Sequence, residues 1–291
     1  MSKFDNMYLD LCEKILTQGI RTEARNGVTY RIPGNYWEFD LEEEFPILTV
    51  KKVGIRLPVT EMLFLYQSKT CEIQWLRDRD IHIWDKFEVD TDGVYRNPDT
   101  GEERFIGKQW AGTYGSSYNY ILRNGGPNGT DQMNNCIFKI THHPEDRRNI
   151  INLWQQQYFP TAVLPPCVYE SQWLVIDGKL HSFFTQRSCD MGLGVPFNIT
   201  QFAALTCMLA QVTNLRPGTM HYHMVDTHIY EIHIDGIKEQ LRRRKDAYPA
   251  PTLWLNPEIK NFYEFDNSKE LKDIKLENYK DLGKVTLELL A

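Results

Sequence analysis

Cys167 and Arg187 are the two residues of this sequence whose types and positions best fit covalent chemistry. A cysteine acts as a nucleophile only as a thiolate, and a nearby guanidinium group lowers the pKa of the thiol. Between them, Asp177-Gly178 separates two apolar runs, which predicts a hairpin with Cys167 and Arg187 on neighbouring strands. A core cysteine is the plain alternative. The arginine favours catalysis, because it is costly to bury without an anionic partner.

Asn198 and Glu61 are polar residues at predicted helices, and each has two interpretations. Asn198 and Gln201 have the spacing of an N-cap and its capping-box glutamine, so a helix over 199–213 capped by Asn198 is the preferred interpretation. Glu61 lies in an apolar helix predicted for 58–67. A buried carboxylate there would have a raised pKa suited to proton transfer, whereas an exposed one would only be solvated.

Four side chains that can bind metals follow one another in a strand predicted for 221–231: His221, His223, Asp226 and His228. Residues two apart on a regular strand share a face, so the first two lie on the opposite face from the last two. A metal site needs converging ligands, so a metal-binding protein is the less favoured hypothesis.

The net charge of −6 argues against a nucleic-acid or acidic-membrane partner, so an anionic ligand must be held by local arginines. Arg147 and Arg148 are adjacent and follow Asp146. They could clamp a phosphate by bidentate hydrogen bonds, although such a turn is usually only solvated. The sequence has neither a P-loop nor a GxGxxG motif, so ATP and NAD chemistry lack support.

The chain of 291 residues is long enough for one large domain or two small ones. The sequence predicts helices over 5–19, 58–67, 199–213 and 232–244, strands over 27–40, 173–176, 179–184 and 221–231, and a long loop over 88–130. Helices and strands in no regular βαβ order favour an α+β or mixed-sheet fold. The six cysteines show no CxxC spacing and no apolar run reaches the length of a membrane span, so we expect a reduced, cytoplasmic protein.

Several stretches of the chain, taken together, resemble the thymidylate synthase family. They are EFPILTVKK (44–52), IWD (83–85), DRR (146–148), PPC (165–167), QRSCD (186–190), LGVPFN (193–198) and DTHIY (226–230). The resemblance runs from about residue 20 to the C-terminus, with a divergent insertion at about 88–112. It implies a single catalytic domain over 1–291.

The resemblance implies a three-layer α/β fold with a large mixed sheet and a homodimer packed through back-to-back sheets. It implies dUMP and 5,10-methylenetetrahydrofolate as substrates, and no metal. Cys167 would add to C6 of the pyrimidine and turn C5 into the nucleophile that takes the one-carbon unit, giving dTMP and dihydrofolate. The implied location is the cytoplasm of a bacterium or of a phage-infected host.

The resemblance also assigns roles to the residues of the site. The catalytic residues would be Cys167, Glu61, Arg187, Tyr114, Asp190 and Asn198, with Glu61 shuttling protons through ordered water and Arg187 helping to keep Cys167 ionised. The nucleotide would be bound by Arg25, Arg187, Ser188, Asn198, His228 and Tyr230, and by Arg147 and Arg148 donated across the dimer interface. The folate would lie against Ile83, Trp84, Leu164, Asp190, Leu193, Gly194, Phe197 and Ala291.

Two positions compete for the family's catalytic tyrosine, which assists removal of the C5 proton. The stretch 107–110 reads Gly-Lys-Gln-Trp, as in the family motif, but position 106 is Ile rather than Tyr. Tyr114 lies at a spacing that continues without gaps to Arg147, so we predict Tyr114. Asn198 predicts dUMP over dCMP, because an amide can accept from uracil N3–H and donate to O4.

The C-terminus departs from the family, since residues 288–291 read Glu-Leu-Leu-Ala. In the family this tail closes over the folate and excludes water, so that the methylene group at C5 accepts hydride rather than water. An altered tail raises the alternative of a phage-type dUMP hydroxymethylase, which would release 5-hydroxymethyl-dUMP and tetrahydrofolate. The retained folate wall favours the synthase.

Overall fold

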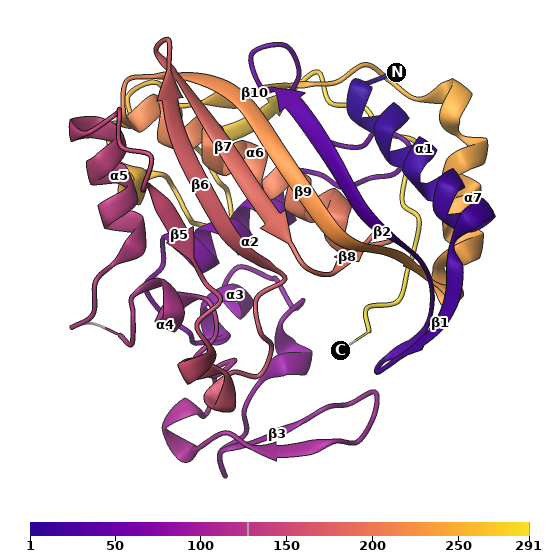
Figure 1. The fold of residues 1–291 in the computed structure, drawn as a ribbon, viewed down its shortest axis with the longest axis horizontal. Helices are drawn as coiled ribbons and strands as arrows, with labels where there is room; N and C mark the ends of the chain where they lie inside the picture. The colour runs from indigo at the N-terminus through magenta and orange to yellow at the C-terminus, as the bar shows by residue number, and fades with distance from the viewer. Residues whose placement is uncertain (127, 291) are drawn as a thin grey trace.

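A seven-stranded mixed sheet forms the centre of the computed structural model, which describes residues 1–126 and 128–290 (Figure 1). The main path has the order β1-β2-β9-β7-β6-β5, and the short β8 pairs with β9. The strands are β1 (Ile20–Ala24), β2 (Gly27–Asp40), β5 (Ile150–Asn152), β6 (Val168–Ile176), β7 (Lys179–Gln186), β8 (Cys189–Asp190) and β9 (Arg216–Tyr230). Because β7 and β8 run parallel to β9 and the other neighbours are antiparallel, the predicted mixed sheet is confirmed.

Two helices cover the sheet in successive layers. Helix α6 (Gly194–Val212) packs against β7, β8 and β9, and α2 (Arg56–Tyr66) packs on α6. Helix α6 is long and apolar enough to span a membrane, but 78% of it is buried within the fold, which is typical of a core helix. Near the edge of the sheet formed by β1 and β2, α1 (Lys3–Gln18) and α7 (Ile234–Arg242) pack together (Figure 1). The sheet, α6 and α2 form the three layers that the family resemblance implies.

The remaining elements are short. They are helices α3 (Gln74–Arg77), α4 (Asn119–Leu122) and α5 (Gln132–His142), hairpins β3–β4 (Val94–Arg96 and Glu103–Phe105) and β10–β11 (Thr252–Leu255 and Ile274–Glu277), and 3-10 turns at Asp85–Phe87, Lys108–Trp110, Gln156–Thr161, Glu231–His233, Arg244–Asp246 and Phe262–Glu264. The prediction of a loop over 88–130 is therefore wrong in part. Buried Tyr95 and Ile106 anchor the β3–β4 hairpin to the core, which explains why this stretch is ordered.

The hairpin predicted around Asp177-Gly178 is formed by β6 and β7. Asp177 and Gly178 have φ angles of 51° and 69°, as a two-residue turn of matching twist requires. Cys167 immediately precedes β6 and Arg187 immediately follows β7, so both lie at the open end of this hairpin.

Helix α6 begins five residues earlier than the sequence predicts. Its N-cap position is Leu193, so Asn198 lies inside the helix and the interpretation of Asn198 as a cap is wrong. Pro196 is tolerated because the first turn needs no backbone N–H donor. Burial of Val195 and Ile199 stabilises the extra turn, an effect that the local capping pattern does not reveal.

Candidate active site

Cys167 and Arg187 meet at the open end of the β6–β7 hairpin. The backbone N–H of Arg187 donates to the carbonyl of Cys167 over 2.9 Å, and Arg187 Nη2 lies 3.9 Å from Cys167 Sγ. The guanidinium group is held in place because Nε donates to Pro166 O over 3.0 Å and Nη2 donates to Pro165 O over 2.8 Å. The structure thus brings together the two side chains that the hairpin predicts to be neighbours.

The surroundings of Cys167 act on its thiol in opposite directions. Burial raises the pKa of the Cys167 thiol, Arg187 lowers it, and the carboxylates of Asp190 and Glu61 add to the increase. Arg187 therefore acts as predicted, but it does not outweigh burial. Additional positive charge or a hydrogen-bond donor is needed before the thiolate dominates near neutral pH.

Glu61 on α2 is partly buried and accepts two hydrogen bonds. Trp84 Nε1 donates to Glu61 Oε1 over 2.8 Å, and Gln201 Nε2 donates to Glu61 Oε2. Burial raises the pKa of the Glu61 carboxyl, and the two hydrogen bonds lower it by less. Of the two interpretations of Glu61, the structure supports the carboxyl group whose pKa is raised toward the range of a proton shuttle.

Asn198 belongs to a continuous chain of side-chain hydrogen bonds that ends at Glu61. Tyr222 Oη donates to Gln186 Oε1 over 2.7 Å, and Gln186 Nε2 donates to Asn198 Oδ1 over 3.1 Å. Asn198 Nδ2 in turn donates to Gln201 Oε1 over 2.9 Å. An ionised carboxylate can only accept, so Glu61 at one end fixes the direction of every amide in the chain. The orientation of the Asn198 amide is therefore set by its neighbours.

The hydroxyl group that contacts Cys167 belongs to Tyr118. The backbone N–H of Cys167 donates to Tyr118 Oη over 3.3 Å. The hydroxyl of Tyr114, which the sequence predicts as catalytic, instead accepts from Asn119 N over 3.4 Å and from Asn119 Nδ2 over 2.9 Å. Both rings pack on Trp84, with centroids 5.5 Å away for Tyr118 and 5.0 Å away for Tyr114. The two tyrosines thus share the contact with Trp84, but their hydroxyl groups differ in partner: that of Tyr118 contacts Cys167 and that of Tyr114 contacts Asn119.

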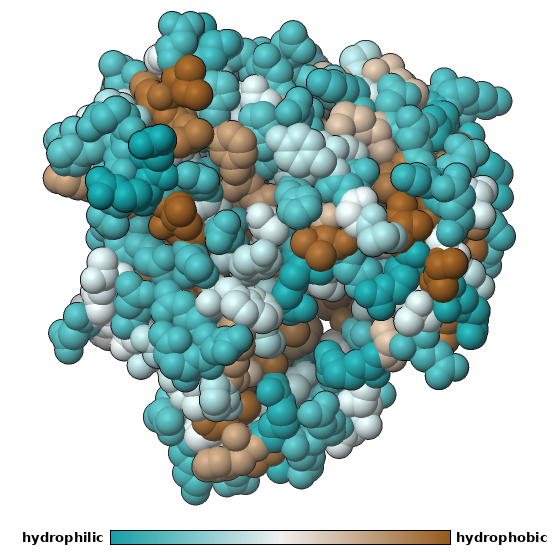
Figure 2. All heavy atoms as spheres, in the orientation of Figure 1, coloured by the Kyte–Doolittle hydropathy of each residue, from teal (hydrophilic) through white to brown (hydrophobic). Residues whose placement is uncertain are grey.

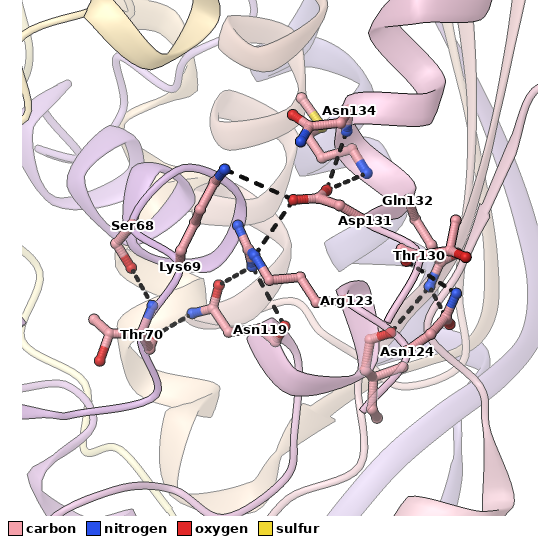
Figure 3. A network of polar contacts seen from close by, with 12 residues as sticks. Ser68, Lys69, Thr70, Asn119, Arg123, Asn124, Thr130, Asp131, Gln132 and Asn134 are labelled. Atoms are coloured by element: carbon pink, nitrogen blue, oxygen red, sulfur yellow. Dashed lines mark hydrogen bonds and ion pairs between the residues drawn. The ribbon is translucent and has the colours of Figure 1, made fainter. Parts of the chain in front are cut away.

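Tyr118 has an unusual backbone conformation, with φ 36° and ψ −88°. Such a conformation costs about 1–3 kcal/mol and persists only where the surroundings impose it. The next residue, Asn119, is held firmly, because its Nδ2 also donates to Thr70 O over 2.6 Å and its Oδ1 accepts from Arg123 Nη1 over 3.1 Å (Figure 3). Arg123 is itself paired with Asp131 over 3.5 Å (Figure 3). This network fixes the start of α4 and with it the Tyr118 ring.

Asp190 lies opposite His228 in the β8–β9 pair, which places the expected folate residue beside an expected sugar residue. Its Oδ1 accepts from Gly192 N over 2.8 Å and lies 3.7 Å from His233 Nδ1. Burial raises the pKa of the Asp190 carboxyl, but the contacts with His233, His228 and Gly192 outweigh burial and leave that pKa lowered. His233 Nε2 donates to Glu288 O over 2.8 Å, so His233 connects Asp190 to the C-terminal tail.

The expected nucleotide-binding residues fall into two groups. Ser188, His228 and Tyr230 lie near the pairing of β8 with β9, and Tyr230 Oη donates to Asn26 Oδ1 over 3.2 Å beside Arg25. By contrast, Arg147 and Arg148 are exposed ahead of the edge strand β5. Arg148 pairs with Asp146 over 2.9 Å, and its side chain is 88% exposed.

A cavity of about 340 Å³ adjoins the Cys167 site. Three arginines and one glutamate line it, namely Arg25, Arg104, Arg187 and Glu102, together with apolar residues that include Leu164. Figure 2 shows this side of the molecule hollowed between the sheet and the lobe that carries β3. The excess of guanidinium groups makes the cavity suited to an anion.

The residues expected to form the folate wall are mostly part-exposed apolar side chains around the same site. Trp84 is buried, while Ile83, Leu164, Leu193, Gly194 and Phe197 are partly exposed. Gly194 begins α6 and lies near Asn198, whose Oδ1 would be 3.6 Å from an added Cβ. Ala291 lies outside the described residues.

The histidines considered as metal ligands have other contacts. His221 Nδ1 is 2.5 Å from Tyr36 Oη, and the His221 ring stacks on Phe183 with centroids 4.3 Å apart. Within residues 1–126 and 128–290, no three His, Cys, Asp or Glu side chains come together as a metal site.

Comparison with known proteins agrees with this geometry. The family model described as thymidylate synthase matches residues 6–291. The chain belongs to the thymidylate synthase family. It is 40% identical to the thymidylate synthase of Clostridium beijerinckii and 36% identical to that of Bacillus licheniformis, in each case over 99% of both chains. Its structure resembles thermostable thymidylate synthase A from Bacillus subtilis with a TM-score of 0.84 and 34% identity over 99% of each chain.

These comparisons confirm the family, with a match that begins nearer the N-terminus than the motifs indicate. Thymidylate synthases are one-carbon transferases that use 5,10-methylenetetrahydrofolate as a co-substrate, so the expectation of an enzyme of this class is confirmed. The relatives carry the name of the synthase, which favours it over the hydroxymethylase alternative.

Four residues of the site are absent from the sequence-based expectations: Tyr118, Gln201 as a partner of Glu61, His233 and Arg104. The sequence pattern predicts Gln201 only as half of a capping box. Its position three residues after Asn198 puts the two side chains on one face of α6, which is the signal that could have revealed their contact.

Proposed function

We propose that this chain, as a single catalytic domain over 1–291, converts dUMP and 5,10-methylenetetrahydrofolate to dTMP and dihydrofolate. The observation that carries the proposal is the approach of Arg187 Nη2 to Cys167 Sγ at 3.9 Å. Around this pair lie an amide suited to uracil, a carboxyl with a raised pKa and a carboxylate suited to the pterin, contributed by Asn198, Glu61 and Asp190.

Cys167 is the nucleophile in this proposal. Its thiolate adds to C6 of dUMP, and the resulting negative charge is shared between C5 and O4. C5 attacks the methylene carbon of the folate, loses its proton, and forms an exocyclic methylene group as tetrahydrofolate is released. Hydride transfer from tetrahydrofolate then gives the methyl group and dihydrofolate, while Cys167 leaves C6. Arg187 supports the first step because it lowers the pKa of the thiol.

We assign removal of the C5 proton to the Tyr118 hydroxyl rather than to that of Tyr114. Tyr118 Oη lies 3.3 Å from the backbone nitrogen of Cys167, so it faces the residue that carries the adduct. The strained backbone of Tyr118 supports this role, since strain is retained where it positions a group for chemistry. Tyr114 is fully buried and holds Asn119, so its role is to support the position of Tyr118.

Glu61 and Asn198 act on the pyrimidine in this proposal. Glu61 exchanges protons with O4 through ordered water, for which its raised pKa is suited. Asn198 accepts from N3–H and donates to O4, which selects uracil over cytosine. Both ends of its amide already have protein partners, Gln186 and Gln201, so a bound base shares or replaces these hydrogen bonds.

The phosphate of dUMP binds to Arg25, Arg187 and Ser188, and the sugar 3′-hydroxyl binds to His228 and Tyr230. We propose a homodimer through back-to-back sheets in which Arg147 and Arg148 reach the phosphate of the neighbouring subunit. The high exposure of Arg148 supports this arrangement, because its side chain is accessible to a second copy. The enzyme works in the cytoplasm, in keeping with six free cysteines.

The folate lies against Ile83, Trp84, Leu164, Leu193, Gly194 and Phe197, with Asp190 on the pterin ring. The C-terminal tail closes over it. The hydrogen bond from His233 Nε2 to Glu288 O supports closure, since it attaches the tail beside Asp190. Exclusion of water by this closed tail favours hydride transfer over hydration of the methylene group.

Mass spectrometry of the product from dUMP and 5,10-methylenetetrahydrofolate tests the proposal. A methyl product with release of dihydrofolate is expected, and a hydroxymethyl product with tetrahydrofolate would show the hydroxymethylase instead. Cys167→Ala should abolish turnover. Continued turnover by this variant would disprove the assignment of Cys167 as the nucleophile.

A further inference from the structure

The insertion at 88–112 brings two charged side chains to the cavity beside Cys167. Its β3–β4 hairpin contributes Arg104 and, just before β4, Glu102. Buried Tyr95 fixes the hairpin, since it pairs directly with Arg104 and also with Val89. In Figure 1 this hairpin lies below the β1–β2 turn, which carries Arg25. The insertion is therefore a fixed wall of the cavity.

Arg104 and Arg187 are anchored on the same short segment that leads to Cys167. Arg104 Nη2 donates to Val163 O and over 3.4 Å to Ala162 O, while Arg187 donates to the carbonyls of residues 165 and 166. Neighbouring carbonyls thus hold two guanidinium groups at one cavity. Among the described residues, the hydrogen bonds of Arg104 all use Nη2, which leaves the Nε and Nη1 donors for a ligand.

Glu102 lines the same cavity and contacts its third arginine, Arg25. Its Oε2 is 3.9 Å from Arg25 Nη1, and both side chains are about half exposed, at 49% for Glu102 and 57% for Arg25. A pair of this length and exposure is weak, so a ligand with two negative charges can replace the carboxylate. Without Glu102 the cavity carries three guanidinium groups from Arg25, Arg104 and Arg187, which together exceed the charge of one phosphate.

We propose that the β3–β4 hairpin acts as an anion clamp in which Arg104 binds the phosphate of the nucleotide beside Arg187, and the phosphate displaces Glu102 from Arg25. The inference rests on the proposed function for the identity of the nucleotide. It adds a phosphate ligand from the insertion to those that the family resemblance implies. The phosphate dianion takes the place at Arg25 that the Glu102 carboxylate occupies in the free protein. Glu102 therefore competes with the phosphate and lowers the affinity of the site for the nucleotide.

The test measures the affinity of the dimeric enzyme for dUMP and for deoxyuridine by isothermal titration calorimetry at low salt. Arg104→Gln should weaken dUMP binding about tenfold, as loss of one charge-assisted contact predicts, and leave deoxyuridine binding unchanged. Glu102→Gln should tighten dUMP binding by up to about fivefold. Arg96→Gln is the matched control, since Arg96 belongs to the same hairpin but pairs with Glu103 over 2.7 Å outside the cavity.

Unchanged dUMP affinity in Arg104→Gln, or an equal loss in Arg96→Gln, would overturn the clamp. Binding of inorganic phosphate to the wild type and to Arg104→Gln separates this inference from the proposed function. If the wild type bound phosphate through Arg104 but did not bind dUMP, the clamp would stand and the proposed function would fail. If the wild type methylated dUMP but Arg104→Gln bound dUMP and phosphate normally, only the clamp would fail.

Discussion

Asn198 Nδ2 donates a hydrogen bond to Gln201 Oε1 over 2.9 Å, and this contact fixes which end of the Asn198 amide is the acceptor. Glu61, at the end of the same chain of hydrogen bonds, accepts from Gln201. The protein thus sets the orientation of the Asn198 amide, which we propose recognises the base, before any base arrives. Such preorganisation lowers the cost of selective binding.

Asn198→Asp should move the substrate preference from dUMP toward dCMP. A carboxylate accepts from the amino group of cytosine but cannot donate to O4 of uracil, so kcat/KM for dUMP should fall about a hundredfold or more. Steady-state kinetics with both nucleotides measure the change. A preference that stayed with dUMP would mean that Asn198 serves only the hydrogen-bond chain within the protein.

Tyr118→Phe should lower kcat about a hundredfold while leaving the covalent complex with 5-fluoro-dUMP and the folate intact, because that complex forms before the C5 proton is removed. Tyr114→Phe is the matched control. It should lose about 1 kcal/mol of stability through its hydrogen bonds to Asn119 and change kcat only a few-fold. Single-turnover kinetics and thermal unfolding distinguish the two variants, and the reverse pattern would return the catalytic role to Tyr114.

His233 and Asp190 should make the stability of the protein depend on pH. Burial lowers the pKa of His233, but Asp190 outweighs burial and leaves that pKa raised. A raised pKa means that the protonated His233 stabilises the fold, and that this contribution is lost as pH rises through its folded-state pKa. The lowered pKa of Asp190 works in the opposite sense, so its contribution is lost as pH falls through that value.

The ion pair between His233 and Asp190 therefore stabilises the fold most at pH values between the folded-state pKa of Asp190 and that of His233. In urea unfolding, the difference in stability between the wild type and His233→Asn should be larger at about pH 6 than at about pH 9. An equal difference at both pH values would show that His233 acts through packing and its hydrogen bond to Glu288 O rather than through charge.

Lys86 joins the insertion to the C-terminal tail, since its Nζ donates to Asp99 Oδ1 over 2.8 Å and to Leu289 O over 2.9 Å. Lys86→Gln should loosen the tail, raise KM for the folate a few-fold and increase the fraction of hydroxymethyl product, because water would reach the methylene intermediate. Product analysis by mass spectrometry measures this fraction. Lys238→Gln, at an exposed position on α7, is the control, and an equal effect in both variants would exclude a specific role for Lys86.

The hairpin that presents Cys167 and Arg187 could be predicted from the sequence because its signals are local. Asp177-Gly178 favours a two-residue turn, and the apolar runs on either side favour strands. The start of α6 could not be predicted in this way. The capping pattern at Asn198 is equally local, but burial of Val195 and the tolerance of Pro196 in the first turn extend the helix past it.

By itself, the sequence determined the family and the proximity of Cys167 and Arg187, because the residue types and their order along the chain carry this information. Only the tertiary structure decided that Tyr118 rather than Tyr114 reaches Cys167 and that Arg104 of the insertion joins the arginines of the cavity. Both outcomes depend on contacts between segments far apart in the chain. Local sequence does not reveal the strained backbone of Tyr118, which is held through Asn119. Nor does it reveal that the buried Tyr95 packs against Arg104 of the neighbouring strand.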